Sequence, residues 1–330
     1  MKLDTMSAFY ERNKLDATKL QTDVTFLEEV EIRLSQQGLF VLLEDLSEDQ
    51  LDQVIQDLLT RNQNTIPHFV ALMRYFKAVK RNDLFIHLTK YTGSLGVMES
   101  ILAKVERLVG LEKAKLMKDQ VTIPPLGTPL EHMPGYTQQF MDVLTHHLSP
   151  EQVKIALTDN HHQIPKEAFV SEKIYYEVCE TLDDYLRDLH ERKVKELEEY
   201  HQSNRVWYEQ EITQEVIDFV RSNQEILSAI RKDHQLFITK IPYDTKAYLE
   251  ATTIQEKQHH VCHCPFVKPS FRKNLPKVSP TWCNCSGGFT KYPFEVLFDQ
   301  ELEITCIETP LKGDLLCRFV ISLEGLDFKH

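Results

Sequence analysis

Apolar residues recur every three or four positions through much of the first 230 residues, and this spacing decides what most of the chain can fold into. It places the apolar side chains on one face of a helix, so we predict a packed helical array. Two capping patterns mark helix starts, Ser47 with Gln50 and Ser149-Pro150 with Gln152. The segments with this periodicity are 24–34, 51–59, 69–79, 84–88, 95–109 and 178–197.

The longest helical pattern runs from Val178 to Leu197 through an otherwise charged stretch. Its apolar stripe needs a surface to pack against, and a second copy of the chain could supply one. We therefore expect homo-oligomerisation through this helix. Cys179 falls within the pattern, where we expect it to behave as an ordinary buried residue.

Residues 122–135 form the clearest internal break, because their four prolines and two glycines do not fit a regular helix. A chain of 330 residues also exceeds the usual size of a single core. We therefore predict a helical domain over 1–121 and a linker over 122–135. A helical segment over 136–234 and a cysteine-rich domain over 235–330 follow.

The last hundred residues change character and predict a small antiparallel sheet. Gln235–Ile241 has the composition of a strand, and two further strands, Glu301–Glu308 and Leu315–Ser322, are joined by a turn at 310–313. We expect Ile304 to pair with Phe319, a register that also places Cys306 opposite Cys317. The predicted fold class is α+β, a mostly helical array followed by this sheet.

Six of the seven cysteines lie between residues 262 and 317. Cys262 and Cys264 form one C-x-C pair, and Cys283 and Cys285 form a second after eighteen intervening residues. Four thiolates complete a tetrahedral shell for zinc, so these four are the predicted metal ligands, with Cys317 and His263 in reserve. Each pair must bend away from an extended strand, because same-face strand residues are separated by nearly ~7 Å.

Two other roles for the thiols are open. The stretch Trp282–Phe289 precedes an apparent helix, and a thiol at a helix N-terminus favours the reactive thiolate form. In that interpretation Cys285 is a nucleophile and His263 its base, while Trp282 and Phe289 wall a small apolar pocket. In the other interpretation the cysteines are plain core residues.

Composition argues against several classes of protein. With 38 basic and 50 acidic residues the net charge is −12, so we expect neither nucleic acid nor anionic membrane as a partner. The longest apolar run, Leu39–Leu43, is far short of the roughly 20 residues of a membrane span. Met1–Thr5 carries early charge and resembles no secretory signal, so we expect a cytoplasmic protein. Only ten glycines and no phosphate loop argue against a dinucleotide-binding fold.

Three C-terminal stretches, 282–289 (WCNCSGGF), 303–308 (EITCIE) and 313–321 (GDLLCRFVI), form a pattern. It resembles bacterial proteins related to the 4-vinyl reductase small-molecule-binding domain and the L-2-amino-thiazoline-4-carboxylic acid hydrolase group. The resemblance implies an α+β domain with a ligand pocket and with cysteines that hold a metal or act chemically. Cys317 matches the closing-strand cysteine of that pattern, and Cys283 or Cys285 matches the cysteine that leads the helix.

Our leading interpretation is a zinc-binding, cysteine-rich domain that binds a small molecule or acts as a sensor, carried on a helical scaffold. One alternative is a cysteine-dependent hydrolase of a small thiazoline or thioester-like substrate, with Cys285 as nucleophile and His263 as base. Another is an interaction scaffold in which the zinc is purely structural.

Overall fold

The structure, a computed structural model, describes residues 2–271 and 275–330 and contains two compact units. Unit 1 combines residues up to Leu95 with Pro124–His132, and unit 2 combines Gly96–Ile123 with Met133–His330. The Pro- and Gly-rich stretch 122–135 is thus divided between the two units. The predicted α+β class is confirmed, because a small antiparallel sheet accompanies a mostly helical chain.

Unit 1 is helical throughout its regular elements and has its own apolar core. The predicted capping box is present at the start of α3, where the Ser47 side chain accepts from the Gln50 amide and the Gln50 side chain accepts from the Ser47 amide. The elements are α1 (Leu3–Arg12), α2 (Ala17–Gln36), η1 (Leu43–Asp45), α3 (Glu48–Thr60), α4 (Ile66–Ala78), α5 (Asn82–Thr92) and η2 (Leu130–His132).

The segment Pro124–His132 returns to unit 1 by way of Gly127, whose φ of +87° suits glycine. Gln56 donates to the Gly127 carbonyl at 3.0 Å. Asn64 donates to the Leu126 carbonyl at 2.8 Å. These bonds satisfy two backbone acceptors of the returning segment, so it is part of the folded unit.

Unit 2 holds the remaining helices, and a second capping box, Ser149 with Gln152, opens α9 as predicted. No described helix of the chain has both the length and the apolarity to cross a membrane. The helices are α6 (Val97–Val109), α7 (Leu111–Lys118), α8 (Met133–His147), α9 (Pro150–Leu157), η3 (Lys166–Ala168), α10 (Val170–Val178), α11 (Leu182–Gln202), α12 (Gln214–Arg221), α13 (Thr245–Glu250), α14 (Ile254–Val261), η4 (Lys268–Phe271), η5 (Pro280–Cys283), α15 (Asn284–Phe298) and η6 (Pro310–Lys312).

The predicted long helix is shorter than expected, because α10 ends at Val178 and α11 begins at Leu182. Thr181 caps the new helix through a capping box with Asp184. Cys179 therefore lies between two helices and is only half-buried. The apolar stripe of α11 packs into two cores of unit 2, with sheet residues in one and residues of α12 in the other. Covering this stripe needs no second copy of the chain.

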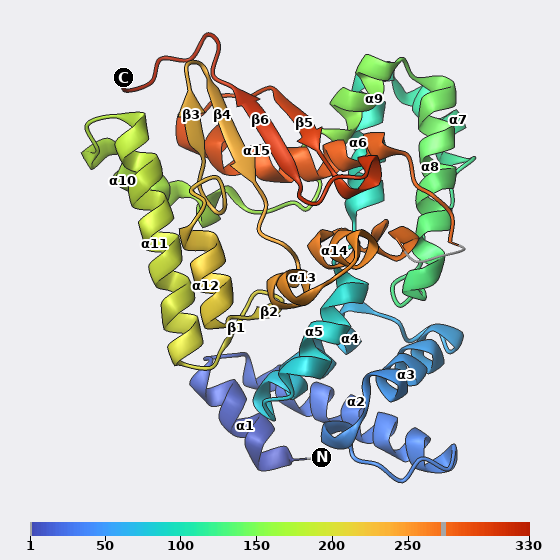
Figure 1. Cartoon of the computed structure of the whole chain (residues 1–330). Coiled ribbons are helices and arrows are strands. Elements are labelled where there is room, and N and C mark those ends of the chain that lie inside the picture. Colours follow the sequence, from blue (N-terminus) through green and yellow to red (C-terminus); the bar gives the residue numbers. More distant parts are fainter. Residues whose placement is uncertain (1, 272–274) are drawn as a thin grey trace. The chain divides into compact units, whose positions relative to one another are not determined.

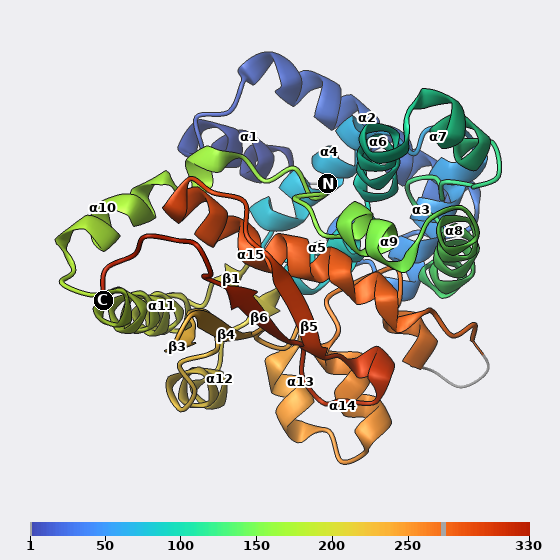
Figure 2. The ribbon, with the colours of Figure 1, turned by 90° about the horizontal axis from the view of Figure 1, so that it is seen from above.

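The main sheet has four antiparallel strands in the order β3-β4-β6-β5, with β6 in the interior (Figures 1 and 2). The predicted register of the last two strands is wrong, since Ile304 pairs with Ile321 and Cys306 with Phe319. A register shift between Cys306 and Glu308 adds an unpaired residue that no alternation pattern reveals. The strands are β1 (Val206–Trp207), β2 (Gln210–Glu211), β3 (Ile230–Lys232), β4 (Gln235–Thr239), β5 (Ile304–Glu308) and β6 (Arg318–Ser322), of which β1 and β2 form a separate pair.

Helix α15 covers one face of the sheet, and its two adjacent glycines explain how closely it packs (Figure 2). A Cβ on Gly287 would meet Ile304 at 3.4 Å and Phe319 at 3.6 Å. A Cβ on Gly288 would lie only 2.2 Å from the backbone oxygen of Asp159. The glycines therefore hold α15 between the sheet and the loop after α9.

Candidate functional site

Backbone contacts bring the first cysteine pair beside the closing strand of the sheet. After β4, the amide of Lys240 donates to the carbonyl of Cys317 at 2.9 Å. The His263 ring contacts the Ile241 carbonyl through Nε2 at 2.5 Å. Because one short stretch of chain touches both Cys317 and the segment 262–264, these cysteines are neighbours in the fold.

Side-chain contacts bring the second cysteine pair beside the first. Trp282 donates from Nε1 to the Cys264 sulfur at 3.3 Å, and the Cys283 sulfur lies 2.8 Å from the Thr309 hydroxyl. Trp282 is fully buried and packs edge-on against Phe140 and Phe266. It is thus a core residue that supports the first pair.

The thiols of this region are free and neutral, and they influence one another electrostatically. Burial is the main cause that raises the pKa of each, to about 11 for Cys306 and about 12 for Cys317. Neighbouring thiols add to the rise, because Cys264 and Cys317 raise the pKa of Cys262. Cys317, Cys262 and Cys306 likewise raise the pKa of Cys283. We call the six residues Cys262, Cys264, Cys283, Cys285, Cys306 and Cys317 the thiol cluster.

Cys285 has a different position in the thiol cluster from the one that the sequence suggests. Among the described thiols, Cys264 is the one whose charge adds to the effect of burial on the Cys285 pKa. Cys317, in contrast, adds to the rise that burial causes in the pKa of both Cys262 and Cys283. Cys317, which sequence spacing put in reserve, thus affects more of these thiols than Cys285 does.

The thiols do not form a finished metal site as they lie. Within residues 2–271 and 275–330, no group of three or more His, Cys, Asp or Glu side chains is placed to hold a metal ion. The sulfurs contact separate partners instead, such as Thr309 for Cys283 and the Glu308 carbonyl, 3.5 Å from Cys306. Side-chain rotation would be needed before these sulfurs could meet at the roughly 2.3 Å bond length of zinc.

The predicted base and nucleophile are not arranged for thiolate chemistry. Burial lowers the pKa of His263 to about 3, and its Nε2 is engaged by the Ile241 carbonyl. The 3₁₀ helix η5 runs directly into α15, so Cys283 and Cys285 do not lie at a free helix start. The dipole effect expected there is outweighed by burial, which raises the pKa of both thiols.

Lys240 is a residue that sequence reasoning missed. Its ammonium group donates to the Ser286 hydroxyl at 3.1 Å and lies 4.8 Å from the centre of the Phe289 ring. The His162 ring meets Phe289 edge-on at 5.4 Å. In the described part of the chain no carboxylate lies within ion-pair distance of Lys240. Burial raises the pKa of Cys264, and the charge of Lys240 counteracts part of that rise, so it offsets part of the cost of a thiolate.

Comparisons with protein-family models, curated proteins and solved structures found no match for this chain. The resemblance of the C-terminal residues to the 4-vinyl reductase and thiazoline hydrolase groups therefore stays an expectation.

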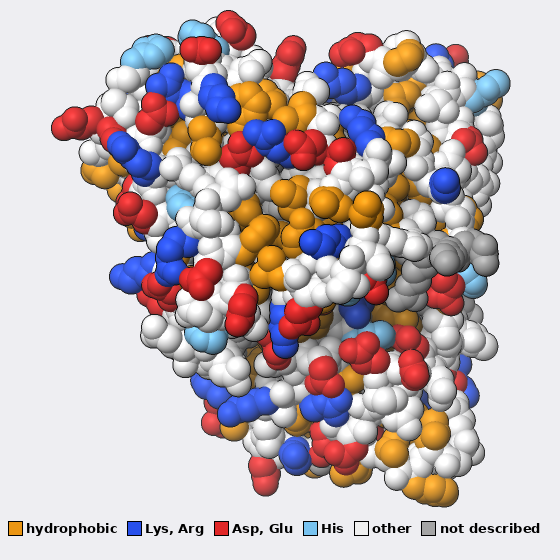
Figure 3. Space-filling view, viewed as in Figure 1, with side chains coloured by type: hydrophobic (Ala, Val, Ile, Leu, Met, Phe, Trp, Pro, Cys, Tyr) orange, Lys and Arg blue, Asp and Glu red, His pale blue; other side chains and the backbone are white. Residues whose placement is uncertain are grey.

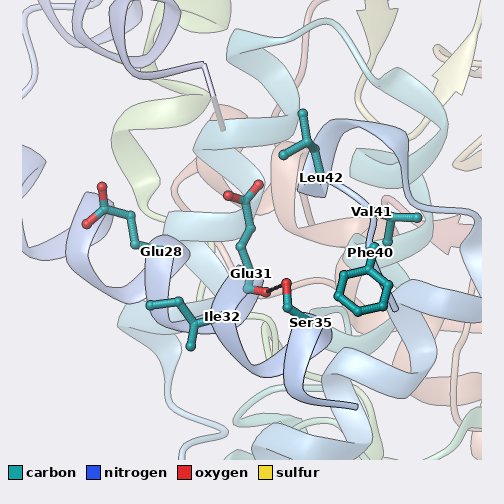
Figure 4. A pocket seen from close by; sticks show the side chains of 7 residues that line it. All are labelled: Glu28, Glu31, Ile32, Ser35, Phe40, Val41 and Leu42. Atoms are coloured by element: carbon teal, nitrogen blue, oxygen red, sulfur yellow. Dashed lines mark hydrogen bonds between the residues drawn. The ribbon is translucent and has the colours of Figure 1, made fainter. Parts of the chain in front are cut away.

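Unit 1 contains a second candidate site, a surface hollow of about 450 Å³ beside α2 (Figure 4). Part of its wall comes from α2, and the rest from the chain that follows the turn at Gly38. The hollow is unrelated to the cysteines, and no sequence motif marks it. Its lining residues are Glu28, Glu31, Ile32, Ser35, Phe40, Val41 and Leu42.

Proposed function

We propose that the thiol cluster binds zinc and that unit 2 is a metal-dependent binding or sensory domain. Cys262, Cys283 and Cys317 are the central ligands in this proposal, and Cys264 or Cys306 is the fourth. The observation that carries it is that separate segments of chain bring cysteines close together: Trp282, beside Cys283, donates to the Cys264 sulfur, and the chain after β4 contacts both Cys317 and His263. Zinc would deprotonate these thiols and replace their present hydrogen bonds with sulfur–metal bonds.

Two lysines favour this function over a neutral thiol core. Lys240 lowers the pKa of Cys264, Cys285 and Cys317, and Lys268 lowers that of Cys262, although burial outweighs both effects. A zinc ion with four thiolates carries a net negative charge, which nearby ammonium groups stabilise. The chain is acidic overall, yet Lys240 has no carboxylate partner among the described residues. Its positive charge is therefore available to stabilise such a site.

The hydrolase alternative has less support. A nucleophilic cysteine needs a lowered pKa or an adjacent base, whereas burial raises the pKa of Cys285. His263, its predicted base, contacts a backbone carbonyl, and no hydrogen bond joins it to a thiol of the described residues. The structural-zinc scaffold remains compatible with the same ligands, and it differs only in lacking a small-molecule partner.

Elemental analysis of the reduced full-length protein, purified without a metal-affinity step, tests the zinc proposal. We expect one zinc per chain, and its loss in Cys283→Ser and Cys317→Ser, because metal affinity depends on every thiolate. Cys179→Ser, which changes a half-buried cysteine outside the thiol cluster, is the matched control and should keep its zinc. Full retention of zinc by Cys317→Ser would remove that residue from the site. A folded wild-type protein that takes up no added zinc under reducing conditions would refute the proposal.

A further inference from the structure

The hollow of unit 1 is surrounded by apolar side chains that the folded chain leaves exposed. Phe40 is 85% exposed, Ile32 56% and Leu42 46%, and all three line the hollow. Figure 3 shows hydrophobic side chains at the surface of unit 1 near the C-terminal end of α2. Single exposed apolar residues are ordinary, but several around one hollow are typical of a surface that binds another molecule.

The walls of the hollow are held in place by the chain itself. At the end of α2, Gly38 adopts a φ of +84°, and the Leu39 amide donates back to the Leu34 carbonyl at 2.9 Å. Further along, the Leu43 amide donates to the Glu31 carboxylate at 3.0 Å. Residues 39–42 are therefore fixed at both ends beside α2, which reduces the ordering cost of binding a partner.

The chemistry of the hollow selects its partner. Glu28 and Glu31 are its charged lining residues, so the charge around the apolar side chains is negative (Figure 4). The backbone of Phe40 and Val41 forms no hydrogen bond with the described part of the chain. A stretch of backbone with open donors and acceptors can pair with another strand.

We propose that this hollow binds an extended peptide segment of a partner protein, in which an apolar side chain is flanked by lysine or arginine. The apolar side chain enters the hollow between Ile32 and Phe40. The peptide backbone pairs with residues 40–41, and its cationic groups approach Glu28. This inference concerns unit 1 alone and is independent of zinc binding by unit 2.

Fluorescence anisotropy with a labelled peptide of alternating valine and lysine tests the proposal on the full-length protein. We expect binding that weakens with salt and falls at least tenfold in Phe40→Ser, because that substitution removes the largest apolar wall. Glu28→Gln should weaken binding less and reduce its salt dependence. Ile254→Ser, at a 65% exposed position of unit 2, is the control and should bind as the wild type does. The changed side chains are exposed, and circular dichroism confirms that each variant folds.

Three results would overturn the inference. Equal binding of a peptide of alternating valine and glutamate would show that the acidic rim does not select the partner. Unchanged binding by Phe40→Ser would place the peptide elsewhere on the chain. Self-association of the wild type that Phe40→Ser abolishes would identify the occupant as a second copy of the chain, which sedimentation velocity would detect.

Discussion

Gly288 is the residue at which one added methyl group should disturb unit 2 most directly. An alanine Cβ would lie 2.2 Å from the backbone oxygen of Asp159 and 2.4 Å from its nitrogen. Backbone atoms cannot move aside as the end of a flexible side chain can. We therefore expect Gly288→Ala to lower the free energy of unfolding by about 2 kcal/mol, measured by chemical denaturation.

Gly135→Ala is the matched control, because this glycine lies exposed in α8 with nothing within 4 Å of a Cβ. Alanine has the higher helix propensity, so we expect no loss of stability and a gain of up to about 1 kcal/mol. Equal destabilisation by both substitutions would show that the close approach of α15 to Asp159 is not what limits position 288.

The sequence showed which residue types could act in a site, but it did not show which of them are neighbours in the fold. The sequence identified the cysteines as candidate ligands, yet it favoured Cys285 over Cys317. The reason is that Cys285 belongs to a C-x-C pair, whereas Cys317 comes beside the other cysteines only when the sheet forms. Lys240 has no motif, and its importance depends on which groups surround it. The pair Gly287-Gly288 follows the second cysteine pair without forming a motif, and its role in helix packing becomes clear only from the contacts at both positions.

At the scale of elements, an ion pair ties β6 to the chain before β3. Both carboxylate oxygens of Glu225 accept from the Arg318 guanidinium at 2.6 Å, and the Thr239 hydroxyl donates to one of them at 2.8 Å. Burial acts to raise the pKa of Glu225, but the hydrogen bonds from Arg318 and Thr239 outweigh it and lower the pKa. The folded state therefore holds this carboxylate in its charged form.

We expect Glu225→Gln to cost about 2 kcal/mol at neutral pH, because it removes the close carboxylate partner of a partly buried guanidinium and leaves Arg318 only its longer contact to Glu308, at 3.4 Å. The folded pKa is below that of the unfolded carboxyl, about 4.3, so the pair stabilises the fold fully above that value. Its contribution disappears as the pH falls through the folded pKa. The stability difference from wild type should thus shrink in acid. Glu301→Gln, an exposed position with the same charge change, should show neither effect. A pH-independent difference would contradict this account.

Helix starts were predictable because the capping boxes at Ser47 and Ser149 act within four residues of chain. Strand register was not, because the shift between Cys306 and Glu308 adds a residue that the alternation of apolar positions cannot show. The break between α10 and α11 was also missed. Val178 fits the periodicity of the following helix, while the Thr181 side chain starts that helix anew.

At the scale of the whole molecule, we predict two thermal unfolding transitions, one for each compact unit. Gly127→Ala should lower the unit 1 transition alone, since a Cβ at φ +87° is strained and would meet Ile55 at 3.0 Å. Gly288→Ala should lower the unit 2 transition alone. Differential scanning calorimetry of both variants checks this, and a single transition that both variants shift would show that the units unfold together.

The α+β class could be predicted from hydrophobic periodicity and turn signals. Which segments belong to which unit could not be predicted from the sequence. Prolines and glycines at 122–135 indicate a break in helical structure, and they do not reveal that Pro124–His132 packs against residues far earlier in the chain. That docking depends on a glycine conformation and on two side-chain bonds from α3 and the turn after it.

The interior place of β6 in the sheet has a consequence for synthesis on the ribosome. All residues of unit 1 have been added once the growing chain reaches His132, so this unit can fold while translation continues. In unit 2, β6 separates β4 from β5 and is the last of these strands to be made. Five cysteines of the thiol cluster are therefore translated before the strand that brings Cys317 beside them. During that interval the nascent chain exposes thiols that oxidants or metal ions can reach.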